Sequence, residues 1–411
     1  MNTKTVVTVV AVVLIVVAGG CLLFNMQKKG GDDNGSEGSD YVTDALGRHV
    51  IIPNGLDGGI VTIGSSGALR FASMFDVYDY IIEVDKGDIT DSKNGRAYSY
   101  AFAYDELDPN TQSHPDSKLE TATLESIVNK RPSLVITMES VWNGYVENFT
   151  ILAKQCTVVV LKDQQMKYMT DADGGLAEYF EFNVNLLGKL FGRDQRASEI
   201  ISGIEGILDD IESLSGTSKT RVYVAGVTIS GSNTLNTTFP TYMPFSINGI
   251  TNAYNLGSTD NKAVLTVEDF TKLDIDMIVV DPSSSDKIMG NQDSQHVLEY
   301  LYGLNNDSDP SNDVPIYITV PIVWDSINYD CALASVYYTS YLVYGNLTLK
   351  DVEEKIDHIF EVFYGEEHSA NVFDDMREFF VGKSSSNGQE MPVLGEVKIA
   401  YGSGMYSFIS A

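Results

Sequence analysis

The chain of 411 residues is long enough for two domains of ordinary size, and its 43% of hydrophobic residues can fill two cores. Its 57 acidic and 27 basic residues give a formal net charge of −30. A field of this sign repels nucleic acid and anionic lipid, so we expect neither as a partner.

The first 40 residues predict an export signal followed by a tether. Residues 5–26 carry no charge and include Ala18-Gly19-Gly20-Cys21-Leu22. A short apolar run followed by small residues and a cysteine is typical of a lipoprotein signal, whereas about 20 uncharged residues can also span a bilayer. We favour lipidation of Cys21 over an uncleaved anchor in residues 1–26, and either holds the protein on the outer face of the cell membrane. Residues 27–40, rich in Gly, Asp, Lys and Ser, predict a flexible tether.

Strand and helix signals alternate along the body of the chain, which predicts parallel sheets and an α/β fold. Residues 42–53 resemble a hairpin. We expect an N-terminal lobe in residues 41–172, a bridging helix in 173–216 and a C-terminal lobe in 217–383, with no predicted role for the tail, 384–411. Apolar residues at helical spacing, interrupted near Gly188 and Gly192, predict a bridge made of one long helix in two pieces. Apolar β-branched runs predict strands at residues 59–63, 80–84, 134–137, 158–161, 221–225, 277–280 and 316–319.

Two segments, one in each lobe, have nearly the same pattern. Residues 121–136 and 265–280 each predict a short helix capped by a threonine, Thr123 or Thr266, and then a turn and a buried strand. The first turn of each helix, where negative charge is tolerated, holds a glutamate: Glu125 and Glu268. The repeat predicts two lobes of one design.

Cysteines and histidines predict no metal site. Cys156 and Cys331 are too few for a disulfide scaffold and are interpreted as buried free thiols. No CxxC, HExxH or Cys/His cluster occurs. Gly64-Ser65-Ser66-Gly67 lacks the glycine spacing of a dinucleotide site, and no G-x-S-x-G elbow appears, so we predict no catalytic residue. The histidines lack ligand spacing and are interpreted as surface or cap residues: His49, His114, His296, His358 and His368.

Four stretches within residues 41–382 resemble, in order, the substrate-binding proteins of ABC importers for iron–siderophore, haem and cobalamin. They are residues 43–50, 121–136, 185–193 and 265–280. The resemblance implies two Rossmann-like lobes bridged by one rigid helix, with the ligand in a cleft between them. It also implies a monomer that docks on the two subunits of an ABC permease, which works with its ATPase. The docking residues of the family match Glu125 and Glu268, and carboxylates suit arginines on a permease.

Ligands of parallel α/β sheets gather at the carboxyl ends of strands. The loops that follow the predicted strands contain Ser65, Ser66 and Tyr145 together with Trp142 and Trp324, the only two tryptophans. One tryptophan in each lobe suits a large chelate as a flat wall, and packing inside the protein is the alternative.

A run of alternating aromatic residues predicts an extended segment on the rim of the cleft, with Tyr98 and Tyr100 on one side. Arg96 beside them suits an anionic group. A strand face packed on the lobe is the alternative. Phe239 and Tyr242 offer a matching aromatic patch in the second lobe.

These features predict an extracytoplasmic protein that binds a metal chelate, namely a ferric siderophore, cobalamin or haem, without a cofactor or chemistry of its own. Two alternatives stay open. One is a surface protein that binds a metal or an oxyanion or acts in adhesion, for which the sequons at Asn148, Asn236, Asn306 and Asn346 would fit a glycosylated exterior. The other is a metalloenzyme of similar two-lobed fold.

Overall fold

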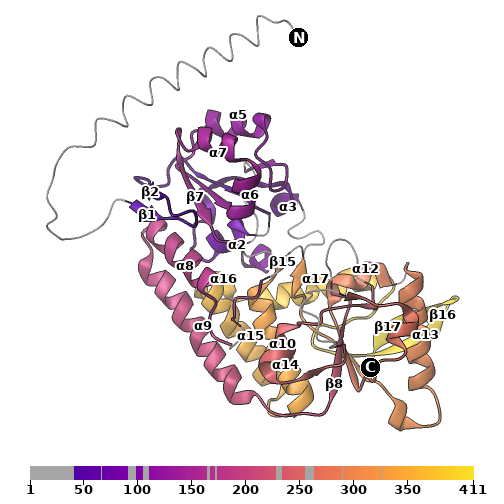
Figure 1. Ribbon diagram of the computed structural model, residues 1–411. Helices are drawn as coiled ribbons and strands as arrows, with labels where there is room; N and C mark the ends of the chain where they lie inside the picture. The colour runs from indigo at the N-terminus through magenta and orange to yellow at the C-terminus, as the bar shows by residue number, and fades with distance from the viewer. Residues whose placement is uncertain are drawn as a thin grey trace, which may run out of the picture.

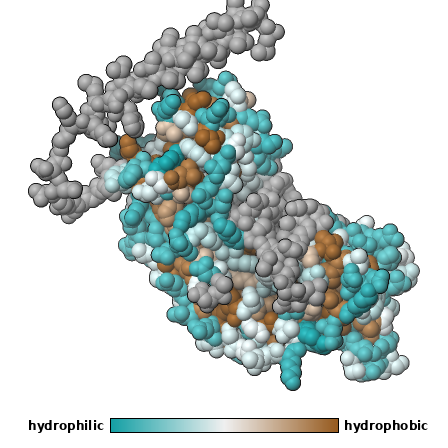
Figure 2. Space-filling view, viewed as in Figure 1, coloured by the Kyte–Doolittle hydropathy of each residue, from teal (hydrophilic) through white to brown (hydrophobic). Residues whose placement is uncertain are grey.

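The computed structural model describes residues 41–65, 67–90, 99–104, 111–163, 167–171, 174–227, 234–254, 263–288, 290–324 and 326–411. Within these ranges the chain forms two α/β lobes, and the long helix α9 (Asp194–Leu214) runs from the N-terminal lobe down along the C-terminal lobe (Figure 1). Hydrophilic residues line the outer edges of both lobes (Figure 2). None of the described helices is long and apolar enough to cross a membrane. The predicted signal, Cys21 and the tether lie outside the described residues.

The N-terminal lobe contains a parallel sheet in the order β5-β4-β3-β6-β7. The neighbouring inner strands β3 and β6 are buried along their whole length, as expected for a sheet covered on both faces. The predicted hairpin is present as β1 (Tyr41–Thr43) and β2 (His49–Ile51). The sheet strands are β3 (Ile60–Ile63), β4 (Ile81–Asp85), β5 (Gln112–His114), β6 (Leu134–Met138) and β7 (Thr157–Leu161), and the helices include α2 (Ala68–Ser73), α3 (Lys86–Thr90), α4 (Tyr100–Ala103), α5 (Thr121–Lys130), α6 (Glu139–Gly144) and α7 (Val146–Leu152).

The C-terminal lobe contains a six-stranded sheet in the order β10-β8-β12-β13-β16-β17. Its parallel strands are β10 (Thr251–Asn252), β8 (Arg221–Ala225), β12 (Met277–Val280) and β13 (Ile316–Ile318). Alternate residues of β8 face two cores. Val222 and Val224 join the core of the helices α10 (Met243–Asn248), α14 (Tyr329–Tyr344), α15 (Leu349–Tyr364) and α17 (Val372–Ser386). Tyr223 and Ala225 join the core of α11 (Val267–Phe270) and α13 (Gln292–Asn305).

The tail, for which the sequence predicts no role, completes this sheet. Strands β16 (Glu396–Gly402) and β17 (Met405–Ser410) form an antiparallel hairpin on β13. Side chains cap the outer edge of β17. Gln295 exchanges two hydrogen bonds with the backbone of Tyr406, at 2.8 and 2.9 Å, and Gln389 accepts from the amide of Phe408 at 2.7 Å. The cap removes the donors and acceptors through which an exposed edge strand would pair with another chain.

Replacing Gln295 by alanine is expected to uncover this edge. The variant loses two hydrogen bonds, which lowers its free energy of unfolding by about 2 kcal/mol, and it should self-associate on mild heating. Light scattering during a thermal ramp, together with urea unfolding, measures both effects. The control is His296→Ala, an exposed neighbour on α13. Equal scattering from the two variants would show that the cap does not guard the edge.

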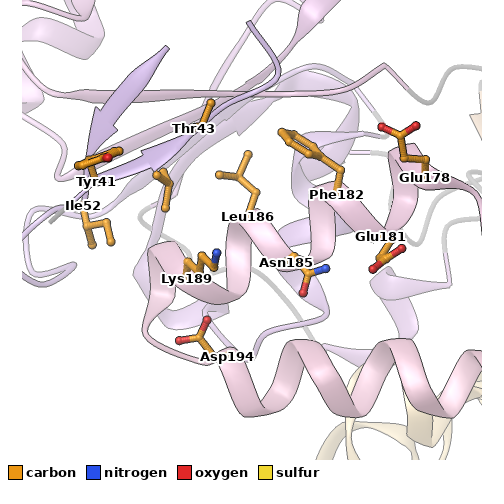
Figure 3. A pocket seen from close by; sticks show the side chains of 11 residues that line it. Tyr41, Thr43, Ile52, Glu178, Glu181, Phe182, Asn185, Leu186, Lys189 and Asp194 are labelled. Carbon is orange, nitrogen blue, oxygen red and sulfur yellow. The ribbon is translucent and has the colours of Figure 1, made fainter. Parts of the chain in front are cut away.

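The predicted bridge of one long helix in two pieces is present as two helices that run in opposite directions. The helix breaks at Gly192, as predicted, but the chain reverses there, so α8 (Glu178–Phe191) and α9 lie side by side as a hairpin (Figure 3). Gly192 takes a left-handed conformation with φ 65°. Gly188 permits the close approach, because a Cβ there would lie 2.6 Å from the Cβ of Ala197. The helix α8 therefore packs on the N-terminal lobe, and α9 carries the chain into the other lobe.

Candidate functional site

The strand order marks one candidate position in each lobe. In the N-terminal lobe the chain runs outward from β3 to β4 and β5 on one side, then to β6 and β7 on the other. In the C-terminal lobe it runs from β8 to β10 on one side and to β12 and β13 on the other. In open α/β sheets, ligands bind outside the carboxyl ends of strands at such switch points. The candidate site therefore lies after β3 and β6 in one lobe and after β8 and β12 in the other.

A glycine with positive φ ends the first strand at each switch point. Gly64 follows β3 with φ 140°, and Gly226 follows β8 with φ 75°. A Cβ on Gly64 would lie 2.7 Å from Cγ of Met138, and a Cβ on Gly226 would collide with Oγ of Ser284. In both lobes the backbone thus passes close to the neighbouring strand end, which only glycine allows without strain.

Asp85 holds the turn after β3 in place. This carboxylate ends β4 and accepts hydrogen bonds from the amides of Gly64, at 2.7 Å, and Ser117. Burial, reinforced by the charge of Asp88, raises the pKa of Asp85 well above its ordinary range. The hydroxyl of Ser117 accepts from the amide of Ser65 at 3.0 Å. The predicted Ser65 is therefore part of the candidate site, while Ser66 lies outside the described residues.

In the C-terminal lobe, the buried carboxylate of Asp281 directly follows β12. Its carboxylate accepts from the amide and hydroxyl of Ser283, at 2.9 and 2.6 Å, and from the amide of Ile322 at 3.1 Å. It thereby joins the loops that follow β12 and β13. Ser285, four residues after Asp281, is fully buried, and its hydroxyl has no hydrogen-bond partner among the described residues. Buried hydroxyls without a partner are uncommon in folded proteins.

Burial raises the pKa of Asp281 from 3.8 to about 6. The hydrogen bonds from Ser283 and Ile322 lower this pKa, but their effect is smaller than that of burial. The folded chain therefore binds this proton more tightly than the unfolded chain does. Stability from this group is present below about pH 4 and lost as the pH rises through 6, by about 3 kcal/mol. We expect Asp281→Asn to lose less stability than the parent between pH 4 and pH 7, measured by urea unfolding. Parallel pH profiles of the two proteins would contradict an ionisable, buried Asp281.

Arg70 connects the two lobes, from the helix that follows β3 to the segment that follows β13. It lies on α2, only 2% exposed, and its guanidinium donates to Oδ1 of Asn328 at 2.9 Å and to the carbonyl of Ile327. Both partners belong to the C-terminal lobe, in the segment between β13 and α14. The side-chain Nδ2 of Asn328 in turn donates to the carbonyl of Pro321 at 3.1 Å. Charge-assisted bonds of this kind are stronger than neutral ones, so Arg70 fixes the contact between the lobes.

Aromatic residues continue this contact as a shared core. Tyr329, at the start of α14, lies 5.2 Å from Phe180 and 6.1 Å from Phe71 between ring centroids. Its hydroxyl is 3.2 Å from that of Tyr179, which donates to it. One cluster of buried residues consequently runs from the N-terminal lobe into the helical layer of the C-terminal lobe.

Of the two predicted tryptophans, Trp142 is packed inside the N-terminal lobe. Trp142 on α6 is 8% exposed, stacks on Phe149 at 5.1 Å and is covered by the guanidinium of Arg48 at 4.0 Å. The structure gives Trp142 the packing role that the sequence left as the alternative, because α6 turns this side chain toward α7 and the first hairpin. Tyr145, at the end of α6, is half-buried. Trp324 is in β14 (Val323–Trp324), and its side chain lies outside what the structure describes.

The aromatic segments are also buried rather than displayed. Tyr100 belongs to the short helix α4, so the prediction of an extended segment is wrong there. Its ring is fully buried and its hydroxyl donates to Asp88 at 2.9 Å, although it stays near the lobe contact, 5.9 Å from Arg70. Phe239 and Tyr242 are each 1% exposed and belong to the core, so they form no surface patch. Arg96 and Tyr98 lie outside the described residues.

The two predicted docking glutamates are exposed. Glu125 is on α5, which is capped by Glu120 and not by Thr123. Glu268 is on α11, which Thr266 caps as predicted, and it accepts from Nζ of Lys272 at 2.7 Å. Each therefore presents a carboxylate to solvent on a different lobe.

Cys331 is buried and Cys156 is half-buried, and both are free thiols. His114 is buried in β5 against Glu83, at 3.2 Å, so its interpretation as a surface residue is wrong. No group of three metal-binding side chains occurs among the residues that the structure describes.

A groove also lies away from the contact between the lobes. It has a volume of about 730 Å³ and lies between the first hairpin and α8, where Tyr41 and Ile52 face Leu186 (Figure 3). Glu178 and Glu181 flank it. The groove is formed by the side of a helix and a hairpin, away from the carboxyl ends of the sheet, so the topological argument favours the contact between the lobes.

No protein-family model matches the chain, and no curated protein matches it in sequence. Solved structures do match. A periplasmic solute-binding protein of Veillonella parvula superposes with a TM-score of 0.56 at 14% identity, over 84% of this chain and 99% of the other. The molybdate-binding protein MolA of Haemophilus influenzae gives a TM-score of 0.56 at 15% identity, over 79% and 98%. An ABC transporter solute-binding protein of Sulfurospirillum deleyianum gives 0.54 at 13%, over 83% and 99%.

All three are binding proteins, and the superposition covers almost the full length of each of them. At these identities the likeness establishes the fold. The chain has the two-lobed fold of periplasmic solute-binding proteins, and the fold predicted from the sequence resemblance is confirmed.

Proposed function

We propose that this chain is the extracytoplasmic substrate-binding protein of an ABC importer, which holds a small ligand between its lobes and delivers it to a permease. The observation that carries the proposal is the contact at Arg70, which joins the helix that follows β3 at the switch point of one sheet to the segment that follows β13 in the other. The fold shared with three binding proteins supports it. Binding and release require no bond to be made or broken, so no catalytic residue is proposed.

A metal chelate, namely a ferric siderophore, cobalamin or haem, is the first ligand class that we propose. The resemblance of four stretches of the sequence to the binding proteins of importers for such chelates supports it.

A small oxyanion is the second class. The specific observation in its favour is the unpartnered hydroxyl of Ser285, which follows Ser284 beside the tight turn at Gly226. One of the matching structures, MolA, binds molybdate.

Docking on the permease is proposed through Glu125 and Glu268. The surface around Glu125 supports this role, because the adjacent helix α7 exposes the apolar side chains of Val146 and Ile151, which are 47% and 40% exposed. A charged residue beside an exposed apolar patch is typical of a protein–protein contact. Attachment to the membrane through residues 1–26, by lipid on Cys21, and a monomeric state complete the proposal.

Isothermal calorimetry tests the ligand. The full chain in detergent solution is titrated with cobalamin, haem, a ferric hydroxamate and molybdate. Saturable binding of one of the first three establishes a chelate-binding protein, and binding of molybdate alone establishes the oxyanion class. Absence of binding to all four would contradict both ligand classes.

A further inference from the structure

One arginine side chain contacts both lobes at the start of the bridging helix. Arg196 lies in the first turn of α9. Its Nε donates to the carbonyl of Met74 at 3.1 Å, and its Nη2 donates to the carbonyl of Val362 at 2.8 Å. Met74 ends α2 in the N-terminal lobe, and Val362 lies in the last turn of α15 in the C-terminal lobe. A single guanidinium therefore bridges three parts of the fold.

The position of Arg196 does not serve its own helix. Carbonyls at the end of a helix lack intrahelical partners and lie at the negative pole of the helix dipole, so a cation there is stabilising. Arg196 donates to carbonyls of this kind at the ends of both α2 and α15. By the same principle a cation is unfavourable in the first turn of α9, where Arg196 itself lies. The side chain is therefore placed for the contact between the lobes.

Neighbouring side chains hold the end of α2 at further points. Arg193 donates to the carbonyl of Phe75 and, at 2.9 Å, to the carboxylate of Asp76. Asp76 also lies 3.3 Å from Nε2 of His368 in the C-terminal lobe. We call residues 73–76 the α2 anchor. Asp76 adopts a left-handed backbone with φ 49°, which is uncommon for a residue other than glycine and is held here by these contacts.

The α2 anchor is mechanically connected to the candidate site. Helix α2 begins just after the turn at Gly64 and carries Arg70, and all six of its residues are buried. A short, fully buried helix moves as one body, because close-packed interiors transmit displacement. A shift of the α2 anchor therefore displaces Arg70 and the turn at Gly64 relative to Asn328.

We propose that Arg196 is a positioning residue that sets the angle between the lobes and thereby the separation of Arg70 from Asn328. Loss of its two bonds releases the end of α2 from the end of α15. The lobes then sample a wider range of angles about the start of α9. This inference concerns the lobes themselves and stands whether or not the proposed ligand classes are correct.

Electron–electron distance measurements between spin labels test this inference without a ligand. Labels are placed on the full chain in detergent at Lys154→Cys in the N-terminal lobe and Glu299→Cys on α13, both exposed positions. Cys21 and Cys156 are changed to serine, and Cys331 stays because it is fully buried. Arg196→Met is expected to lengthen and broaden the distance distribution. Arg196→Lys, which keeps the charge but not the planar fork, is expected to lie in between.

The matched control is Arg377→Met, which removes an arginine paired with Glu353 and Asp374 inside the C-terminal lobe. It should lower thermal stability while leaving the distance distribution of the parent. A parental distribution in Arg196→Met, with only a lower melting temperature, would reduce Arg196 to ordinary packing and overturn the proposal. If Arg196→Met does not fold, Arg196→Lys alone tests the proposal. A distance distribution in Arg196→Lys equal to that of the parent would then overturn the proposal.

Discussion

A chain in which Glu125 and Glu268 are both replaced by alanine is expected to bind its ligand with unchanged affinity and to lose transport. Neither carboxylate touches the candidate site, and both are exposed, so the fold should be unaffected. Removing one partner of a desolvated charge pair costs about 2–5 kcal/mol, and two such pairs cost at least about 4 kcal/mol. Docking on the permease should therefore weaken about a thousandfold or more. Uptake of labelled ligand by cells, alongside calorimetry on the purified chain, measures the two effects.

The control for this prediction must change the net charge equally. Glu205→Ala with Glu299→Ala removes two exposed carboxylates from α9 and α13 and is expected to transport normally. The pair Glu268 and Lys272 does not oppose docking, because an exposed ion pair is worth only about 0–1 kcal/mol and is readily exchanged for another. Normal transport by the double variant at Glu125 and Glu268 would remove the docking role from these residues. Loss of ligand binding in that variant would show that they act on the fold.

Local patterns carried the prediction of the sheets, because a buried parallel strand needs only a short apolar run and a turn. Strands β3, β6 and β12 lie where those runs are, and the loops after them contain Ser65 and Asp281. The break at Gly192 was also predictable, since glycine is the usual residue for a left-handed helix end. The reversal of the chain at this break was not predictable. Whether two helices continue or fold back depends on packing, here on Gly188 against Ala197, which a helical period cannot show.

The candidate site needed contacts between distant parts of the chain. Arg70 is recognisable in the sequence only as one residue of a predicted helix, and its partner Asn328 lies far along the chain. Trp142 was attractive as a ligand wall because it follows a strand, yet Arg48 covers it from the first hairpin. The signal that could have found the polar residues is modest but real. Asp85 and Asp281 each fall at the carboxyl end of an apolar run, where a buried carboxylate must be satisfied by loop amides.

Replacing Arg70 by methionine is expected to have the largest effect on binding. The guanidinium is buried, so its loss leaves the carbonyl of Ile327 and the side chain of Asn328 without these donors in the interior. Each unsatisfied buried group costs about 1–3 kcal/mol, so the free energy of unfolding should fall by about 2–6 kcal/mol. Because these bonds join the helix that follows β3 to the segment that follows β13, ligand affinity should fall as well. Urea unfolding and calorimetry measure the two effects separately.

A control arginine separates stability from binding. Arg48 in the same lobe bonds Asp44 at 3.0 Å and covers Trp142, so Arg48→Met also loses a charged contact and packing. We expect it to lower stability and leave affinity unchanged, because it lies at the first hairpin and not at a strand end. Arg70→Lys should keep part of the affinity, since it retains the charge but cannot place two donors in one plane. Full affinity in Arg70→Met would show that the ligand does not depend on the contact between the lobes, and the candidate site would then have to be sought elsewhere on the molecule.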